Sequence, residues 1–187
     1  MNILKVFLLL IAGGAALIGT ALSEHVHSPR WKVKTLEDAF VVSSQVVPTS
    51  IAEQDALPAP TVGEQVTRLP SERTVYEVTA QLIQIKKEFD GDYHLVLEDP
   101  ATKLKMVAEI PDTNALEPLP YREDFARARQ KIDAAIGRPG LFAEHPSGKR
   151  MVEITGIGFF DEPHILTPDG MAPNGREIHP VLHIKLM

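Results

Sequence analysis

From Thr74 onward, apolar and polar side chains alternate in five separate segments, and this alternation limits the possible folds more than any other feature of the sequence. A period of two places successive side chains on opposite faces of a β-strand. Asp90-Gly91 suits a tight turn, so we expect the first three strands to form a meander. In the last strand the alternation places Val181 on the face opposite to Ile178. The predicted strands are Val75–Ile85, Tyr93–Leu97, Lys103–Ile110, Met151–Phe160 and Ile178–Leu186.

One helix is predicted between the third and fourth strands. Apolar residues recur at helical spacing from Tyr121 to Ile136. The acidic residues Glu123 and Asp124 fall in the first turn, where the helix dipole favours them, and Gly137 is placed to end the helix.

The order of elements is therefore strand, strand, strand, helix, strand, strand. Gly156 and Gly158 lie in the fourth strand, where they permit sharp bending or the close approach of another element. This order resembles the five-stranded Greek-key barrel of the oligonucleotide/oligosaccharide-binding (OB) fold family. The resemblance implies a mainly β, OB-like domain over residues 73–187, with its helix between strands three and four. An open α+β sheet packed on one helix is the alternative.

The first 23 residues have the pattern of a secretory signal peptide. Lys5 precedes the apolar run Val6–Leu22, and the small residues Ala21 and Ser23 stand where a signal peptidase acts. We therefore expect cleavage before Glu24, export to the periplasm or the cell exterior, and no stable membrane insertion afterwards. An uncleaved anchor is the alternative, because Ile3–Leu22 could just span a bilayer.

Residues 24–72 are rich in proline, serine and threonine and show no long periodicity. This composition predicts an extended lead-in rather than a second domain. We expect this lead-in to wrap the barrel as an N-terminal strap, held by Trp31 and Phe40. One or two helical turns are expected within Ser50–Leu57.

The composition excludes several kinds of chemistry. The chain has no cysteine, which rules out disulfides, thiol catalysis and cysteine-ligated zinc. Its 25 acidic and 19 basic side chains give a net charge of -6, so no generic attraction to nucleic acid is expected. The sequence also lacks a glycine-rich phosphate loop, a Gly-x-Ser-x-Gly elbow and a His-Glu-x-x-His pair. Seryl and zinc-protease catalysis are therefore unsupported.

Asp161, His164, Glu177 and His179 bracket the loop between the last two strands, which borders the binding face in OB folds. Carboxylates and imidazoles gathered there could hold a divalent ion or act as an acid/base pair. Glu177 and His179 leave the same face of the strand, because one residue separates them. The spacing of the four residues matches no established zinc signature. The alternative is that Asp161 caps a turn, His164 is solvated, and Glu177 and His179 satisfy loop backbone groups.

A second group of candidate ligand contacts comprises Asp92, His94, Asn174 and Arg176. If Tyr93 and the leucines of its strand face the core, His94 points outward. It is then either a ligand contact or an exposed or hydrogen-bonded histidine of no special function.

Five short phrases also resemble a family of uncharacterised exported bacterial proteins. The phrases are Trp31-Lys32-Val33-Lys34-Thr35, Asp92-Tyr93-His94-Leu95-Val96-Leu97, Ala108-Glu109-Ile110-Pro111-Asp112, Gly156-Ile157-Gly158-Phe159-Phe160-Asp161 and Ala172-Pro173-Asn174-Gly175-Arg176-Glu177-Ile178-His179-Pro180-Val181-Leu182. This resemblance spans the lead-in and the barrel together and carries no activity, substrate or catalytic residue to this chain. The last phrase departs from the family pattern at Arg176, where an aliphatic residue is usual, and the segment 162–169 differs as well.

The sequence favours an exported, non-catalytic OB-like domain that binds an unknown small or polymeric ligand, or a partner protein, and requires no cofactor. The alternative is a divalent-metal-dependent hydrolase, including the possibility of a nuclease. That enzyme would use Asp161, His164, Glu177 and His179.

Overall fold

The computed structural model describes residues 28–114, 120–141, 145–161 and 171–187. The predicted signal peptide and His164 lie outside these ranges. The elements, in chain order, are α2 (Pro29–Thr35), β1 (Val46–Thr49), α3 (Ile51–Asp55), the 3-10 turn η1 (Pro70–Glu72), β2 (Val75–Lys87), β3 (Tyr93–Glu98), β4 (Lys105–Ile110), α4 (Arg122–Ala135), β5 (His145–Phe160) and β6 (Arg176–Leu186).

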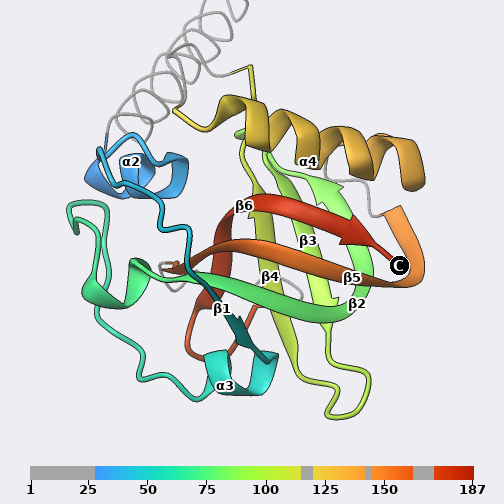
Figure 1. Ribbon diagram of the computed structural model, residues 1–187, viewed down its shortest axis with the longest axis horizontal. Coiled ribbons are helices and arrows are strands. Elements are labelled where there is room, and N and C mark those ends of the chain that lie inside the picture. The colour runs from blue at the N-terminus through green and yellow to red at the C-terminus, as the bar shows by residue number, and fades with distance from the viewer. Residues whose placement is uncertain (1–27, 115–119, 142–144, 162–170) are drawn as a thin grey trace, which may run out of the picture.

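Five of the strands close into a barrel in the order β2-β3-β4-β6-β5, and β5 returns to pair with β2 (Figure 1). The pairing between β4 and β6 is parallel, and the other barrel pairings are antiparallel. The chain is thus mainly β, with an OB-like Greek-key barrel and its helix α4 between the third and fourth barrel strands. The predicted fold class is confirmed.

The inward faces of the strands form one apolar core. In β4 the predicted alternation is confirmed, because Met106, Ala108 and Ile110 are all buried in that core. Helix α4 lies across the top of the barrel in Figure 1 and adds Phe125 and Ile132 to the core. Among the described residues, apolar side chains fill the interior of the barrel, so we expect a binding site on its outer face or at its ends.

A bulge in β6 changes which side chains face the core. Gly156 pairs with Val181 and Gly158 pairs with Ile178, so three steps along β6 oppose two along β5. The additional residue puts both Ile178 and Val181 in the core. The expectation that Val181 faces away from Ile178 is therefore wrong, because strict alternation does not survive a bulge.

Other side chains pack closely against Gly158, as a glycine within a strand predicts. A Cβ atom there would collide with the guanidinium of Arg176 and the ring of Tyr76. The absence of a side chain at Gly158 thus lets Arg176 cross β5 inside the protein.

The lead-in packs on the barrel through several short elements. β1 adds to β2 in parallel, and α3 confirms the helical turn expected within Ser50–Leu57. The segment around Trp31 is the helix α2 rather than extended chain. Ser28 accepts a hydrogen bond from the Trp31 amide at 3.0 Å, and Pro29 occupies the first helical position, so this sequence can start a helix.

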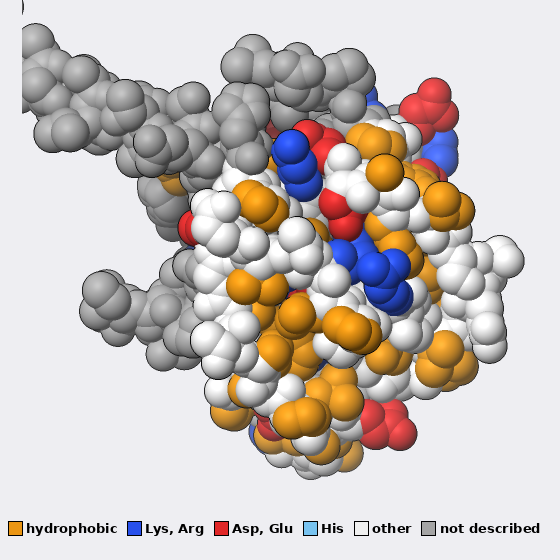
Figure 2. All heavy atoms as spheres, turned by 90° about the vertical axis from the view of Figure 1, so that its left-hand side faces the viewer, with side chains coloured by type: hydrophobic (Ala, Val, Ile, Leu, Met, Phe, Trp, Pro, Cys, Tyr) orange, Lys and Arg blue, Asp and Glu red, His pale blue; other side chains and the backbone are white. Residues whose placement is uncertain are grey.

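The lead-in covers one side of the barrel. Figure 2 shows that side of the molecule, where apolar side chains gather over the lower half. Trp31 is buried, and Phe40 packs against the core from the same segment.

Within the described ranges, no helix is both long enough and apolar enough to cross a membrane.

Candidate functional site

Charged side chains are buried on the outer face of β3, β4 and β6, beneath α2. This buried cluster consists of Lys34, Asp92, Glu109, Glu177 and His179. Its members come from the helix of the lead-in, the start of β3, the end of β4 and the start of β6. Barrel closure therefore brings together residues that are up to 145 positions apart.

His179 lies at the centre of the buried cluster and is fully buried. Its Nδ1 atom is 3.0 Å from Glu109 Oε2 and 3.4 Å from Glu177 Oε1. On the other side of the ring, Nε2 is 3.5 Å from Asp92 Oδ2. The predicted shared face of Glu177 and His179 is thus observed, and two further carboxylates join them.

The polar atoms at this centre are close together but poorly hydrogen-bonded. Neither ring nitrogen of His179 makes a hydrogen bond of acceptable geometry within the described residues, and neither does Glu177 Oε1. Buried polar atoms are almost always hydrogen-bonded, because leaving one without a partner costs about 1 to 3 kcal/mol. Nitrogen and oxygen atoms that face each other at these distances without well-formed hydrogen bonds are chemically suited to sharing a cation.

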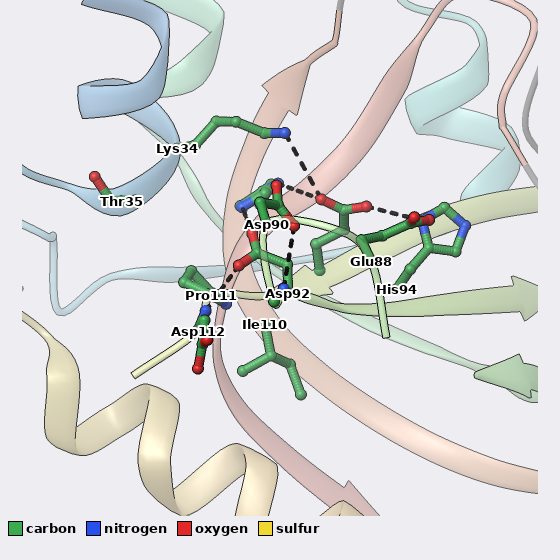
Figure 3. Close-up of polar contacts among 12 residues, drawn as sticks. Lys34, Thr35, Glu88, Asp90, Asp92, His94, Ile110, Pro111 and Asp112 are labelled. Atoms are coloured by element: carbon green, nitrogen blue, oxygen red, sulfur yellow. Dashed lines mark hydrogen bonds and ion pairs between the residues drawn. The ribbon is translucent and has the colours of Figure 1, made fainter. Parts of the chain in front are cut away.

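Lys34 supplies a positive charge from α2. Its Nζ lies 3.8 Å from Glu109 Oε2 and 5.8 Å from the centre of the Phe159 ring. Figure 3 shows Lys34 reaching down from α2 toward the carboxylates carried by the barrel strands. One ammonium group against three carboxylates leaves the buried cluster with an excess of two negative charges when His179 is neutral.

The surroundings shift the protonation of the carboxylates in opposite directions. Burial, helped by Glu109 and Asp161, raises the pKa of Glu177 to about 7. Burial acts the same way on Glu109, but Lys34 and the two neighbouring histidines outweigh it and hold the pKa of Glu109 well below its ordinary value. Glu109 therefore stays ionised while Glu177 titrates near neutral pH.

The cationic groups respond to the same charges. Burial lowers the pKa of His179, but Asp92, Glu109 and Glu177 together raise it well above its ordinary value. The pKa of Lys34 is raised in the same way, since the carboxylates outweigh its burial. In the absence of a bound cation, a proton on His179 would thus offset part of the negative charge.

Glu109 joins the buried cluster to a second histidine. Its Oε1 atom is 2.8 Å from His94 Nδ1, whereas Oε2 faces His179. His94 Nδ1 is in turn 3.6 Å from Glu88 Oε1, and Glu88 is partly exposed. Figure 3 shows Glu88 and His94 side by side at the edge of this network. A chain of titratable groups thus runs from the surface to His179.

His94 points away from the barrel core, as expected, and is a buried, hydrogen-bonded histidine rather than an exposed one. Tyr93 and Leu95 face the core as predicted, and His94 is on the opposite face, but only 4% of its surface is exposed. Val96 and Val107 are buried on that outer face as well. Alternation determines the face to which a side chain points, but not whether another part of the chain covers that face.

The hairpin between β2 and β3 positions Asp92. Gly91 has a φ of +96°, which favours glycine, and a Cβ atom there would collide with Asp112. The amide of Asp112 donates a hydrogen bond to Asp92 Oδ1 at 2.7 Å, which leaves Oδ2 directed toward His179. The Arg129 side chain donates to the Gly91 carbonyl at 3.0 Å and holds the hairpin from below. The carboxylate of Asp92 is therefore fixed in place.

Asn174 and Arg176 bond the lead-in to the barrel. The side-chain amide of Asn174 donates to the carbonyls of Gln54, Asp55 and Leu57 at the end of α3. Arg176 is fully buried and donates to Gln54 Oε1 at 2.8 Å and to the Ser71 carbonyl. These two candidate ligand contacts hold the strap in this structure and are not part of the buried cluster.

Of the four residues predicted around the last loop, Glu177 and His179 lie in the buried cluster. Asp161 lies close enough to influence the pKa values of Lys34 and Glu177, and His164 falls outside the described residues. Sequence analysis proposed no role for Lys34 or Glu109. Both occur in the phrases 31–35 and 108–112, which resemble the exported family, and that was the only signal marking them.

The buried cluster has two chemical capacities. One ligand atom from each of Asp92, Glu109 and His179 lies within 4.8 Å of the others, so these three side chains could hold a metal ion. The histidines bridged by Glu109 could also pass a proton between the surface and the site.

Comparison with known proteins gives little further guidance. No protein-family model and no curated protein matches the chain. Among solved structures, asparaginyl-tRNA synthetase from Entamoeba histolytica is similar at 12% identity and a TM-score of 0.43, and its complex with asparaginyl-adenylate at 13% identity and 0.43. Each match covers 78% of this chain but only 24% of the synthetase. A likeness at this level supports no conclusion about activity.

Proposed function

We propose that this chain is an exported, non-catalytic OB-like binding domain that holds its ligand at the buried cluster. One observation carries the proposal. His179 is fully buried among three carboxylates, and its ring nitrogens and Glu177 Oε1 lack well-formed hydrogen bonds. The expectation of export rests on the signal pattern of residues 1–23.

Stability alone does not account for the buried cluster. Taking charged groups out of water costs several kcal/mol for each ion, and only good geometry with complete hydrogen bonding offsets that cost. Both ring nitrogens of His179 and Glu177 Oε1 lack such bonding. Groups with perturbed pKa values and incomplete bonding are typical of sites that act on something else.

The burial of the site supports binding rather than catalysis. Asp92, Glu109, Glu177 and His179 are between 0% and 8% exposed. A hydrolase needs room beside these groups for a substrate and a water molecule. Within the described residues these groups are instead enclosed, with Lys34 of α2 against Glu109, which suits a small ligand.

The first experiment asks whether the buried cluster is a ligand site or a stability element. Glu177→Gln keeps the shape of the side chain but removes its charge. We expect the free energy of unfolding, measured in urea at pH 8 with EDTA present, to rise by about 1 to 3 kcal/mol. A residue whose charge serves a ligand gives up stability in the ligand-free protein.

The matched control is Glu72→Gln, the same substitution at another buried glutamate. Both Glu72 oxygens already accept hydrogen bonds from Arg30 and from backbone amides. This variant should lower the free energy of unfolding. If Glu177→Gln lowered it as well, the buried cluster would be a stability element and the proposal would be wrong.

The metal-dependent hydrolase is a second candidate, and the chain Glu88–His94–Glu109–His179 favours it. Such a relay could deliver a proton from the surface to a leaving group. The test is hydrolysis of a chromogenic phosphodiester with Zn²⁺ or Mn²⁺ supplied. If the wild type hydrolyses this substrate and both His94→Gln and His179→Ala lose the activity, the protein is a hydrolase and the proposal of a non-catalytic binding domain is wrong.

A further inference from the structure

We propose that the ligand of the buried cluster is a single divalent transition-metal ion, held by Asp92, Glu109 and His179 with Glu177 beside them. This inference rests on the proposed function and names its ligand. The protein would then be a metal-binding domain whose ion sits on the outer face of the barrel under α2.

The separations between the donor atoms fit one ion. Ligand atoms bound to one metal at about 2.0 to 2.6 Å lie at most about 4 to 5 Å apart, and neighbouring ones about 3 to 3.5 Å apart. Atoms of Asp92, Glu109 and His179 all lie within 4.8 Å of one another. Nδ1 of His179 is 3.0 Å from Glu109 Oε2, and Nε2 is 3.5 Å from Asp92 Oδ2. Because a histidine binds one ion through one ring nitrogen, the carboxylate beside the other nitrogen has to approach the ion for all three side chains to coordinate it.

The unpaired atoms point to the ion independently of these distances. If His179 carried two protons, both N–H groups should donate to the carboxylates around the ring, yet neither makes a well-aligned hydrogen bond. A metal ion bound to one ring nitrogen removes the need for that bond. With the ion on Nε2, Glu177 beside Nδ1 orients the ring, as outer partners of metal-bound histidines usually do.

The donor set selects the kind of ion. Carboxylates with one imidazole suit Zn²⁺ and Mn²⁺, whereas Ca²⁺ and Mg²⁺ prefer oxygen donors throughout. The net charge of the buried cluster also fits a divalent ion. With His179 neutral, Lys34 compensates one of the three carboxylates and leaves two negative charges. A divalent ion would make the buried cluster neutral.

Lys34 sets the affinity of the site. Its ammonium group shares the Glu109 carboxylate with the proposed ion, at 3.8 Å from Oε2. Two cations at such a distance repel each other, so Lys34→Met should tighten metal binding by about 10-fold or more. Lys32→Met, two residues away on the exposed side of α2, is the matched control and should leave the affinity unchanged.

The experiment titrates Mn²⁺ into the purified, EDTA-treated protein and follows the loss of the free-ion signal by electron paramagnetic resonance. Zn²⁺ then competes for the same site. We expect each protein molecule to bind one Mn²⁺ ion. Zn²⁺ should displace it, whereas the same concentration of Mg²⁺ or Ca²⁺ should not. Since altering even an outer partner of a ligand weakens binding by about 10- to 100-fold, His179→Ala should cost at least about 100-fold. His183→Ala, on the same strand but exposed, should bind as the wild type does.

Lys34→Met protects the test against misfolding of His179→Ala, because it predicts a gain of affinity rather than a loss. Wild-type protein that binds neither Mn²⁺ nor Zn²⁺ would overturn the metal proposal, and so would binding that His179→Ala leaves intact. The outcomes for the two proposals are separable. If Glu177→Gln stabilises the protein but no metal binds, the buried cluster remains a ligand site and only the ion is wrong.

Discussion

Two groups of buried charges in this protein look alike in composition and differ in bonding. The first is a clasp of Arg30, Asp38, Arg68 and Glu72, which ties the lead-in to the barrel. Glu72 accepts hydrogen bonds at both oxygens, from the Arg30 guanidinium and from the amides of Leu69 and Phe160.

Arg68 completes the clasp in the same manner. It forms two hydrogen bonds with Asp38, at 2.7 and 2.9 Å, and others with the carbonyls of Val33 and Glu72. Among the described residues, the buried cluster has three buried polar atoms without such bonds, both ring nitrogens of His179 and Glu177 Oε1, whereas the clasp has one, Arg30 Nε. Burial of charge by itself therefore does not identify a functional site. Incomplete bonding of buried charge is the more informative feature.

Breaking the clasp should have the largest effect on stability. Glu72→Ala removes the partner of a buried arginine and the acceptor of two amides, so we expect a loss of about 3 to 5 kcal/mol in the free energy of unfolding. Urea denaturation followed by circular dichroism measures it. A loss below about 1 kcal/mol would show that the clasp, despite its bonding, contributes no more than a surface ion pair.

The second-largest expected difference between the clasp and the buried cluster is in how their stability depends on pH. The raised pKa of Glu177, about 7 against an ordinary 4.5, means that its contribution to stability is greatest below pH 4.5 and is lost as pH rises through 7. The raised pKa of His179 acts in the same direction above its ordinary value of 6.5. Glu109, whose pKa is lowered, loses its contribution only in acid.

Metal-free protein should therefore become less stable between pH 5 and pH 8. The part due to Glu177 is on the order of 2 to 3 kcal/mol and should disappear in Glu177→Gln. Urea unfolding at several pH values in EDTA measures the slope. An unchanged slope in this variant would place the titrating group elsewhere.

A smaller effect is expected at Lys34, which has an ion pair but no close hydrogen bond. In metal-free protein Lys34→Met should lower the free energy of unfolding by about 1 kcal/mol, because the carboxylates lose a counter-charge. Added Zn²⁺ should reverse the loss. Lys32→Met is the control. A larger loss in the free energy of unfolding in Lys32→Met than in Lys34→Met would contradict the role of Lys34 as the counter-charge of the carboxylates.

The smallest effect is expected on the exposed face of α4. Arg127 pairs with Glu123 and Asp124 across one helical turn, and all three side chains are well exposed. Such pairs contribute little, so Arg127→Ala should leave the thermal midpoint unchanged. A clear shift in a calorimetric scan would show that exposed pairs matter more here than the comparison of the two buried regions suggests.

The sequence was sufficient for much of the framework. Period-two alternation gave the barrel strands, the helical spacing before Gly137 gave α4, and Asp90-Gly91 gave the first hairpin. The shared face of Glu177 and His179 also followed from their spacing. All of these depend on contacts between near neighbours in the chain, and local pattern records such contacts directly.

The tertiary structure alone determined which segments cover the outward-facing side chains of the barrel strands. Glu109 and His94 have the same place in the alternation whether solvent or another segment covers them, and only tertiary packing buries them. The bulge that turns Val181 inward depends on pairing with β5. Lys34 meets Glu109 because a helix 75 residues earlier folds back over the barrel. No local pattern encodes such a meeting, because it depends on closing the chain around a shared core.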